Sequence, residues 1–277
     1  MIDRLFKYWG IFCTFLGLIV LAILLTKIFS DGFSRISWDF LSSLPSRFPE
    51  KAGILTAWTG TLWIFCLTAI IAIPVGIGAA IYLEEYSGKG FLSRVLEINI
   101  SNLAGIPSII YGILGLEIFV RVMKLGESVL AGSMILALLI LPIIIVSTRE
   151  ALKSVPKTIK EASHALGASK WQTIWYQLLP AASSNIITGI ILALSRAIGE
   201  TAPLIMIGAL TYVPFIAKSP MDEFTVLPIQ IFNWISRPQE GFIINAAAGI
   251  IILLSIVFVM NGIAVWLRWR AQKKVTW

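Results

Sequence analysis

Long apolar segments separated by short polar ones dominate the pattern along the chain. A helix needs about 20 apolar residues to cross the hydrocarbon core of a membrane, and each segment reaches that length. The segments are residues 9–29, 54–83, 95–122, 129–148, 181–210 and 242–267. They are too long for barrel strands, and a spanning backbone must satisfy its own hydrogen bonds. The pattern therefore predicts an all-α polytopic membrane protein with six transmembrane helices.

Two of these segments contain helix-breaking residues. The segment 54–83 holds Gly60, Pro74, Gly76 and Gly78, and the segment 95–122 holds Gly105 and Pro107. A proline inside a helix removes one hydrogen bond and clashes with the preceding turn. We expect kinked or broken helices at both places, either for packing against other helices or for lining a path.

Basic residues between the segments predict the orientation, because cytoplasmic loops retain Lys and Arg. With the N-terminus inside, the larger basic share is cytoplasmic: Arg4, Lys7, Lys89, Arg94, Arg149, Lys153, Lys157, Lys160, Lys170, Arg268, Arg270, Lys273 and Lys274. The smaller share on the opposite side is Arg35, Arg47, Lys51, Arg121, Lys124, Lys218 and Arg237. We therefore expect a plasma (inner) membrane protein with both termini cytoplasmic. The net charge of +7 then requires no nucleic-acid partner.

The domain organisation follows from the same pattern. Residues 1–53 form an uncleaved first helix and an extracytoplasmic loop, since no small-residue cleavage site follows the first segment. Residues 54–268 form the transmembrane domain, with one long cytoplasmic loop at about 149–180, and residues 269–277 form a cytoplasmic tail.

Composition narrows the possible chemistry. The 277 residues are 57% hydrophobic and 13% charged, against about 25% charged in soluble domains. Cys13 and Cys66 lie in apolar segments and His164 is the only histidine, so we expect neither a disulfide framework nor a histidine-ligated metal. No phosphate-binding G-x-x-x-x-G-K-[ST] occurs. We therefore expect no cofactor and no catalysis by this chain.

The cytoplasmic loop reads REALKSVPKTIKEASHALGASKWQTIWYQLLP. Pro156 is suited to a first helical turn, and Gly167 to a turn before a second helix near Ala168. Apolar residues recur at helical spacing in both halves: Ile159, Ala162 and Leu166, then Trp171, Ile174, Trp175 and Leu178. Two short amphipathic helices joined at a glycine suit docking to a partner or to the membrane surface.

Spacing in this loop is more specific than its amphipathic character. Glu161, Ala162 and Ser163 are followed after three residues by Gly167, and after nine more by a stretch that ends in Leu179 and Pro180. This resembles the EAA motif of ABC importer permeases, with Ser163 and Gln177 as departures. The resemblance implies a MetI-like, type I fold whose coupling helices seat on an ATP-binding subunit. The alternative is a surface helix with a solvated glutamate.

The fifth segment contains two charges. Arg196 and Glu200 are four residues apart, so on a helix they share one face. A charge at membrane depth costs several kcal/mol unless it is paired or faces water. Two interpretations stay open. The pair neutralises itself and holds helices in register, or Arg196 offers its planar fork to a passing oxyanion while Glu200 tunes that charge.

Three further stretches resemble the PstA-type permease subunits of phosphate importers. They are RAIGETAPLIMIGA, NLAGIPSIIYGILGL and GAAIYLEEY. The resemblance implies import of inorganic phosphate, with Arg196 and Glu200 in the substrate pathway. It also implies a homologous permease subunit as a heterodimer partner, two ATP-binding cassette subunits, an extracytoplasmic phosphate-binding protein and surrounding membrane lipid.

Other functions stay open from the residues alone. A permease for sulfate, molybdate or phosphonate is one, and a passive channel or scaffold is another. An intramembrane hydrolase would need a base for Ser195, and the single histidine lies in the cytoplasmic loop. We interpret Glu97, Lys27 and the spacing of Glu117 and Arg121 as structural.

Overall fold

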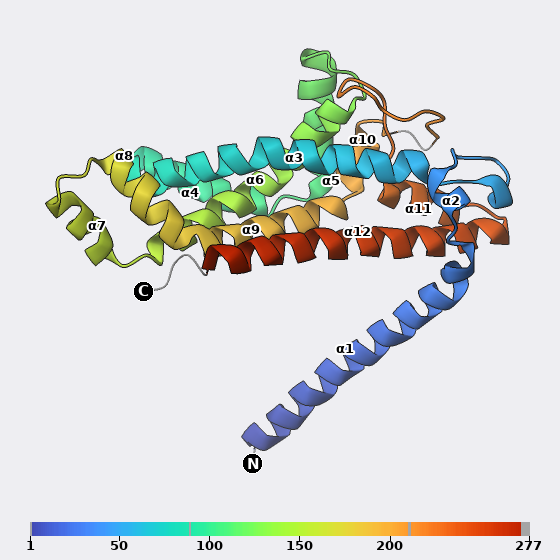
Figure 1. Cartoon of the computed structure of the whole chain (residues 1–277), viewed down its shortest axis with the longest axis horizontal. Coiled ribbons are helices and arrows are strands. Elements are labelled where there is room, and N and C mark those ends of the chain that lie inside the picture. The colour runs from blue at the N-terminus through green and yellow to red at the C-terminus, as the bar shows by residue number, and fades with distance from the viewer. Residues whose placement is uncertain (1, 89, 210–211, 273–277) are drawn as a thin grey trace.

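A computed structural model describes residues 2–88, 90–209 and 212–272 (Figure 1). The longer helices are α1 (Ile2–Gly32), α3 (Leu55–Ile81), α4 (Phe91–Ala104), α6 (Val129–Lys153), α9 (Leu179–Ile198) and α12 (Glu240–Gln272). The shorter ones are α2 (Trp38–Ser42), α5 (Ser108–Gly115), α7 (Lys157–Ala165), α8 (Lys170–Thr173), α10 (Ala202–Met206) and α11 (Leu227–Ile235). Short 3-10 turns are η1 (Phe33–Arg35) and η2 (Pro49–Lys51), and π turns are η3 (Tyr82–Tyr86), η4 (Leu116–Val122) and η5 (Ile174–Leu178).

The predicted all-helical membrane fold is confirmed. Five helices of the described chain are long and apolar enough to span a membrane: Phe6–Arg35, Leu55–Tyr86, Val129–Lys153, Lys170–Ile198 and Glu240–Arg270. The predicted segment 95–122 makes a sixth span when its two parts are counted together. The end of the fifth predicted segment at Leu210, and Lys89, Lys273 and Lys274 of the basic set, lie outside the described residues.

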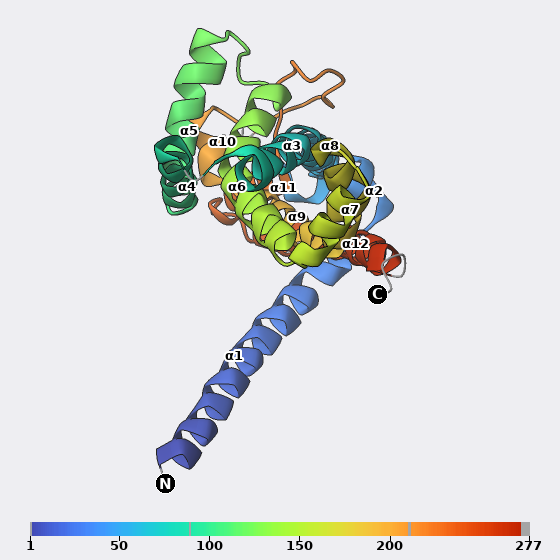
Figure 2. The ribbon, with the colours of Figure 1, turned by 90° about the vertical axis from the view of Figure 1, so that its left-hand side faces the viewer.

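The break expected in the third segment is confirmed, and it is sharp. Ser93–Ala104 and Ser108–Val122 meet at 106°. Gly105 is the C-cap of α4, and Pro107 is the N-cap of α5, where its fixed φ angle suits the entry into a helix. The bend redirects the chain beside the bundle, as α5 and η4 show (Figure 2).

A break in the second segment is not found. Helix α3 continues through Pro74 to Ile81 before it passes into η3. Gly76 serves close packing instead: a Cβ atom added to it would lie 2.5 Å from Cγ2 of Ile144 on α6. The expected break was therefore wrong for this segment, and the close approach of α3 and α6 at Gly76 agrees with the packing alternative.

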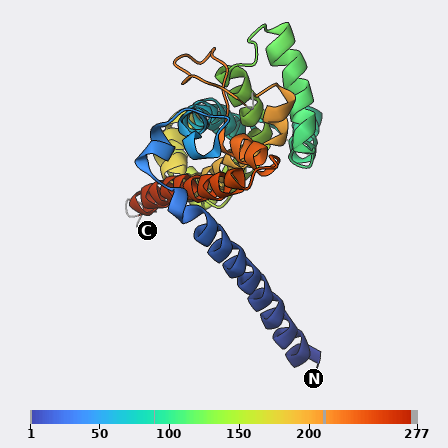
Figure 3. The ribbon, with the colours of Figure 1, turned by 90° about the vertical axis from the view of Figure 1, so that its right-hand side faces the viewer.

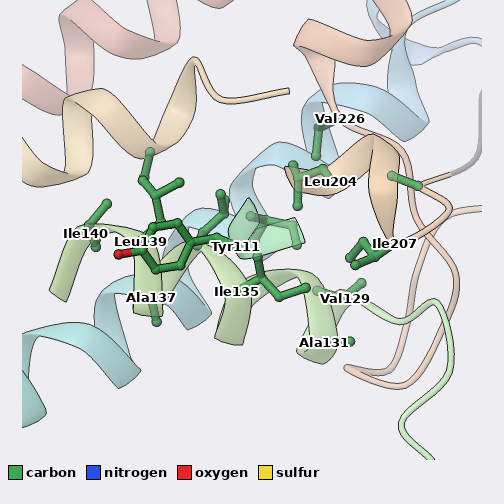
Figure 4. Close-up of a cluster of buried hydrophobic side chains, with 14 of the residues drawn as sticks. Tyr111, Val129, Ala131, Ile135, Ala137, Leu139, Ile140, Leu204, Ile207 and Val226 are labelled. Atoms are coloured by element: carbon green, nitrogen blue, oxygen red, sulfur yellow. The ribbon is translucent and has the colours of Figure 1, made fainter. Parts of the chain in front are cut away.

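The core lies where α3, α6 and α9 pack side by side. Buried aliphatic residues of α6, such as Ile135 and Ile140, meet Tyr111 of α5 and Leu204 of α10 (Figure 4). At one end of the bundle, α2 and α11 form a cap in which Phe40 packs against Trp234 with ring centroids 5.9 Å apart. At the other end lies α7 (Figure 1).

Helix α1 diverges from the bundle (Figures 2 and 3). None of its apolar window is buried within this chain. It joins the bundle only near its last turns, where Gly32 lies so close to Ala247 and Ala248 of α12 that an added Cβ would come within 2.5 Å of the Ala248 nitrogen. An apolar helix surface of this size requires lipid or another protein to cover it.

Candidate functional site

Arg196 lies in the last turn of α9, and Glu200 lies beyond the end of that helix. The predicted fifth helix over 181–210 is therefore too long at this end. Pro203 explains the stop, because a proline ring in a continuing helix would clash with the carbonyl of Gly199 four residues earlier. Gly199 caps α9, and the short α10 follows with Pro203 in its first turn.

Although they do not share one helix, Arg196 and Glu200 do pair. The Nε atom of Arg196 donates to Oε1 of Glu200 over 3.3 Å. The Arg196 side chain is 44% exposed and that of Glu200 18%. Within the described residues the pair uses Nε alone, which leaves the two Nη groups of the arginine fork for another acceptor. Glu200 partly balances the charge that Arg196 presents at this helix end.

The surroundings of the pair come from two of the quoted sequence stretches. Tyr111 of α5 is buried, and its hydroxyl donates to the Leu103 carbonyl over 2.8 Å. The Tyr111 bond holds the bend between α4 and α5. Helix α10 packs on α5 so closely that a Cβ atom on Gly112 would lie 2.8 Å from Cα of Pro203. Stretches almost a hundred residues apart thus meet beside the charged pair.

Ser195, next to Arg196, is used for helix packing. Its hydroxyl donates to Oδ1 of Asn261 on α12 over 2.7 Å. His164 lies on α7 at the end of the bundle, where Nδ1 is 3.1 Å from the Ala168 carbonyl. Serine and histidine are therefore not brought together, and the arrangement gives no support to an intramembrane hydrolase.

The turn expected at Gly167 is present and well defined. Gly167 has φ of +83°, a conformation that glycine adopts without strain. Its N–H donates to the His164 carbonyl over 2.9 Å, and the N–H of Ala168 donates to Ser163 over 3.2 Å. These two bonds form the Schellman arrangement that ends a helix. Pro156 is the N-cap of α7, one residue before the predicted first turn.

The second helix of the loop departs from the prediction. It begins at Lys170, where Ser169 and Gln172 form a capping box, and not at Ala168. It then continues through η5 into α9 as one span, Lys170–Ile198. The expectation of a second short, separate helix was therefore wrong, because the helix continues through Pro180 into α9.

The residues of the predicted EAA motif lie on both sides of this turn. Glu161 and Ala162 are exposed on α7, and Ser163 Oγ lies 2.9 Å from Thr173 Oγ1, which ties α7 to α8. Leu179 is partly buried at the start of α9 and Pro180 is exposed. The serine that departs from the motif therefore has a structural use in this loop.

An apolar surface remains exposed on the same loop. Leu166 is 90% exposed, and the rings of Trp171 and Trp175 stack at 5.6 Å while both stay exposed. The predicted apolar stripe of the second helix divides, because Ile174 and Leu178 are buried in the bundle. Exposed aromatic and aliphatic groups of this kind mark docking surfaces.

A cluster of ion pairs close to this loop was not anticipated. Arg149 lies within α6 and pairs with Glu97 of α4, while its Nε atom is 3.6 Å from Oε2 of Glu84. Lys160 of α7 pairs with Glu85. Glu97, interpreted from the sequence as structural, is thus an ion-pair partner of Arg149. The expected pair of Glu117 and Arg121 is confirmed at 2.9 Å.

These features define the class: a polytopic helical membrane protein with a charged pair at a helix end and a helical loop with exposed apolar side chains at one end of its bundle. Residues 72–273 match the family model of the binding-protein-dependent transport system inner membrane component. The chain belongs to this family, and it is a transport subunit of the inner membrane with several spans.

Three known proteins illustrate the similarity. The phosphate transport system permease protein PstA of Mycobacterium leprae is 35% identical, over 88% of this chain and 82% of its own. The probable ABC transporter permease protein YqgI of Bacillus subtilis is 32% identical over 93% of each chain. The solved MetNI methionine ABC transporter, in inward-facing form, has a TM-score of 0.61 at 18% identity and covers 79% of this chain and 95% of its own. This last likeness confirms the predicted MetI-like fold.

Proposed function

We propose that this chain is the permease subunit of an ATP-driven importer of inorganic phosphate. The observation that carries the proposal is the pair of Arg196 and Glu200 at the end of α9, in a chain whose 35% identical relative is a phosphate transport permease. The free part of a guanidinium fork matches the oxygens of a tetrahedral oxyanion. Glu200 limits the attraction, so that a doubly charged ion is not held too tightly to leave.

The loop from α7 to α8 supports the second part of the proposal. With its Gly167 turn and exposed Leu166, Trp171 and Trp175, it would seat on one of two ATP-binding cassette subunits. Glu161, Ala162, Ser163, Gly167, Leu179 and Pro180 would form this coupling region. The loop would then be cytoplasmic, as would both termini, in agreement with the positions of the basic residues.

A homologous permease subunit would complete the pathway. Closure of the ATP-binding subunits would move the loop, and the helices would alternate between inward-open and outward-open arrangements. An extracytoplasmic phosphate-binding protein would deliver the ion to the opposite end, near α2, α11 and the chain between α10 and α11. This chain would hydrolyse no ATP itself.

The test is uptake specificity in proteoliposomes that contain the complete transporter and its binding protein. Labelled phosphate should enter only with ATP inside, and excess sulfate, molybdate or phosphonate should leave its uptake unchanged. If one of those ions were taken up in preference to phosphate, that ion and not phosphate would be the substrate. Entry of phosphate without ATP would instead indicate a passive channel.

A further inference from the structure

Turn η3, at the end of α3, contacts three different elements through three successive side chains. Glu84 contacts Arg149 of α6, Glu85 contacts Lys160 of α7, and the Tyr86 ring lies 4.8 Å from Nζ of Lys170 on α8. Neighbouring residues on a helix point in different directions, so one turn can reach three partners. A π turn within an α-helix is rare and frequently marks a functional position.

Glu85 is the most enclosed member of this group. Its side chain is 10% exposed, and its partner Lys160 comes from a helix with no buried residue. A carboxylate so withdrawn from water is costly without its counter-charge, and breaking a buried pair is strongly destabilising. The pair of Glu85 and Lys160 therefore holds together more firmly than an exposed ion pair would.

Helix α7 has few other attachments to the bundle. Ile159 packs partly against buried residues at this end, and Ser163 bonds to Thr173 within the loop itself. The Lys160 contact is the ion pair that joins α7 to the end of α3. A displacement of α7 would therefore act directly on η3, at the end of α3, through the pair of Glu85 and Lys160.

The same turn is also fastened to the membrane helices. Arg149 of α6, whose side chain is 14% exposed, lies between Glu84 of η3 and Glu97 in the middle of α4, and so joins the end of α3 to α6 and α4. We propose that η3 transmits the movement of the α7–α8 loop to these three helices, with Glu85 and Lys160 as its positioning pair. This inference rests on the proposed function, in which an ATP-binding subunit moves that loop.

The proposal separates docking from transmission. The docking surface, formed by Leu166, Trp171 and Trp175, lies on the exposed side of the loop, whereas Glu85 and Lys160 lie between the loop and the bundle. Loss of the pair should leave the ATP-binding subunit attached and active while less transport results from each ATP. Loss of docking would instead remove the ATP-binding subunit.

The experiment measures phosphate imported per ATP hydrolysed by the complete transporter in proteoliposomes. Lys160→Glu and Glu85→Lys should each lower this ratio about fivefold or more, in the range of ordinary coupling free energies. The exchanged double variant should restore more than half of it, and Lys160→Arg should keep it. Lys157→Glu, an equal change at an exposed position of α7, is the matched control. The proposal would be overturned if either single variant kept the ratio of the unaltered transporter. It would also be overturned if the exchanged double variant had a ratio no higher than the single variants.

A distance measurement keeps the test independent of the transported ion. Cys13 and Cys66 are replaced by serine, and spin labels are placed through His164→Cys on α7 and Ser87→Cys after η3. One narrow distance distribution is expected with and without ATP, and a broad one in Lys160→Glu. If the unaltered transporter hydrolyses ATP but moves no phosphate, the proposed function fails, and this distribution alone decides the inference. An unchanged distribution in Lys160→Glu contradicts it.

Discussion

Arg196 is the residue on which the proposed substrate pathway depends. Its guanidinium is half exposed at the end of α9 and shares a single contact with Glu200. We expect Arg196→Gln to lower the rate of phosphate uptake roughly 10- to 150-fold, the loss of one charged hydrogen-bonding partner of the anion. Uptake by the complete transporter is the measurement, with copurification of the ATP-binding subunits as evidence of assembly.

Arg121→Gln provides the matched control for that change. Arg121 also pairs with a glutamate four residues away, Glu117, but both side chains are well exposed on η4. An exposed pair contributes little, so uptake should stay close to that of the unaltered protein. If the two variants lost the same share of the uptake rate, or if Arg196→Gln lost none, Arg196 would have no role in the substrate pathway.

Asp222 gives a prediction for acid conditions. Its carboxylate accepts hydrogen bonds from the backbone N–H groups of Lys218 (2.8 Å) and Ser219 (2.9 Å), and these bonds lower its pKa. The lowered pKa means that the stabilisation is complete above the unfolded value, about 3.9, and is lost as the pH falls through the lower folded value. The Asp222 carbonyl accepts a hydrogen bond from the Val129 N–H at the start of α6. The loop around Asp222 should therefore stay ordered at pH 5 and become less ordered only in stronger acid.

Hydrogen exchange of residues 212–226, corrected for intrinsic rates, measures this effect. Asp222→Asn should exchange faster than the unaltered protein at pH 6, and the difference between the two should shrink as the acid limit is approached. A difference that grows toward low pH would contradict the assigned direction of the pKa.

At the scale of elements, the turn between α7 and α8 depends on Gly167. A β-branched side chain at φ of +83° is strained, by roughly 1–2 kcal/mol. Gly167→Val should displace α8 relative to α7 and weaken retention of the ATP-binding subunits, as measured by copurification. Transport should fall in the same proportion.

Gly88→Val is the control for that substitution. Gly88 lies near the same end of the bundle, has no positive φ, and nothing lies within 4 Å of an added Cβ. The ATP-binding subunits should be retained in this variant. If Gly167→Val retains them equally, the docking role of the turn is wrong.

Element types could largely be predicted from the sequence, but element ends could not. The apolar segment 181–210 extends past Ile198, so the end of α9 cannot be located from hydropathy. The available signal was Gly199 followed four residues later by Pro203, since glycine is a poor helix former and a proline ring clashes with the carbonyl four residues earlier. In the third segment, Gly105 and Pro107 did predict the break.

The candidate site was predicted in part. Arg196 and Glu200 stood out because charges are rare in apolar segments. The sequence did not single out Glu84, Glu85 and Arg149, because they lie at the ends of apolar segments, where charged residues are common. Their pairing depends on how α3, α4 and α6 meet, which joins positions far apart in the chain and has no local pattern.

For the whole molecule, α1 is notable because the described residues bury none of its apolar window. Only its final turns contact α12, through Gly32. In the proposed assembly the homologous subunit and lipid would surround the remainder. The angle of α1 therefore depends on how its last turns pack on α12, where the two backbones come closest at Gly32.

Gly32→Leu tests that approach. An added side chain would overlap the backbone of Ala247 and Ala248 and should cost about 1–3 kcal/mol. We expect a lower thermal midpoint of the purified complex. Gly17→Leu, in open space on the same helix, should leave the midpoint unchanged. An unchanged midpoint for Gly32→Leu would mean that α1 is held in another way.

The central claim is that this chain forms a path for phosphate that is driven by ATP. The most direct measurement is uptake of labelled phosphate by proteoliposomes that contain the complete transporter, with ATP or a nonhydrolysable analogue enclosed. Phosphate should accumulate above its outside concentration with ATP and should not with the analogue. If phosphate with ATP enclosed only reached the outside concentration, or did not enter, the account would be contradicted. Passive equilibration of phosphate with the analogue enclosed would also contradict it.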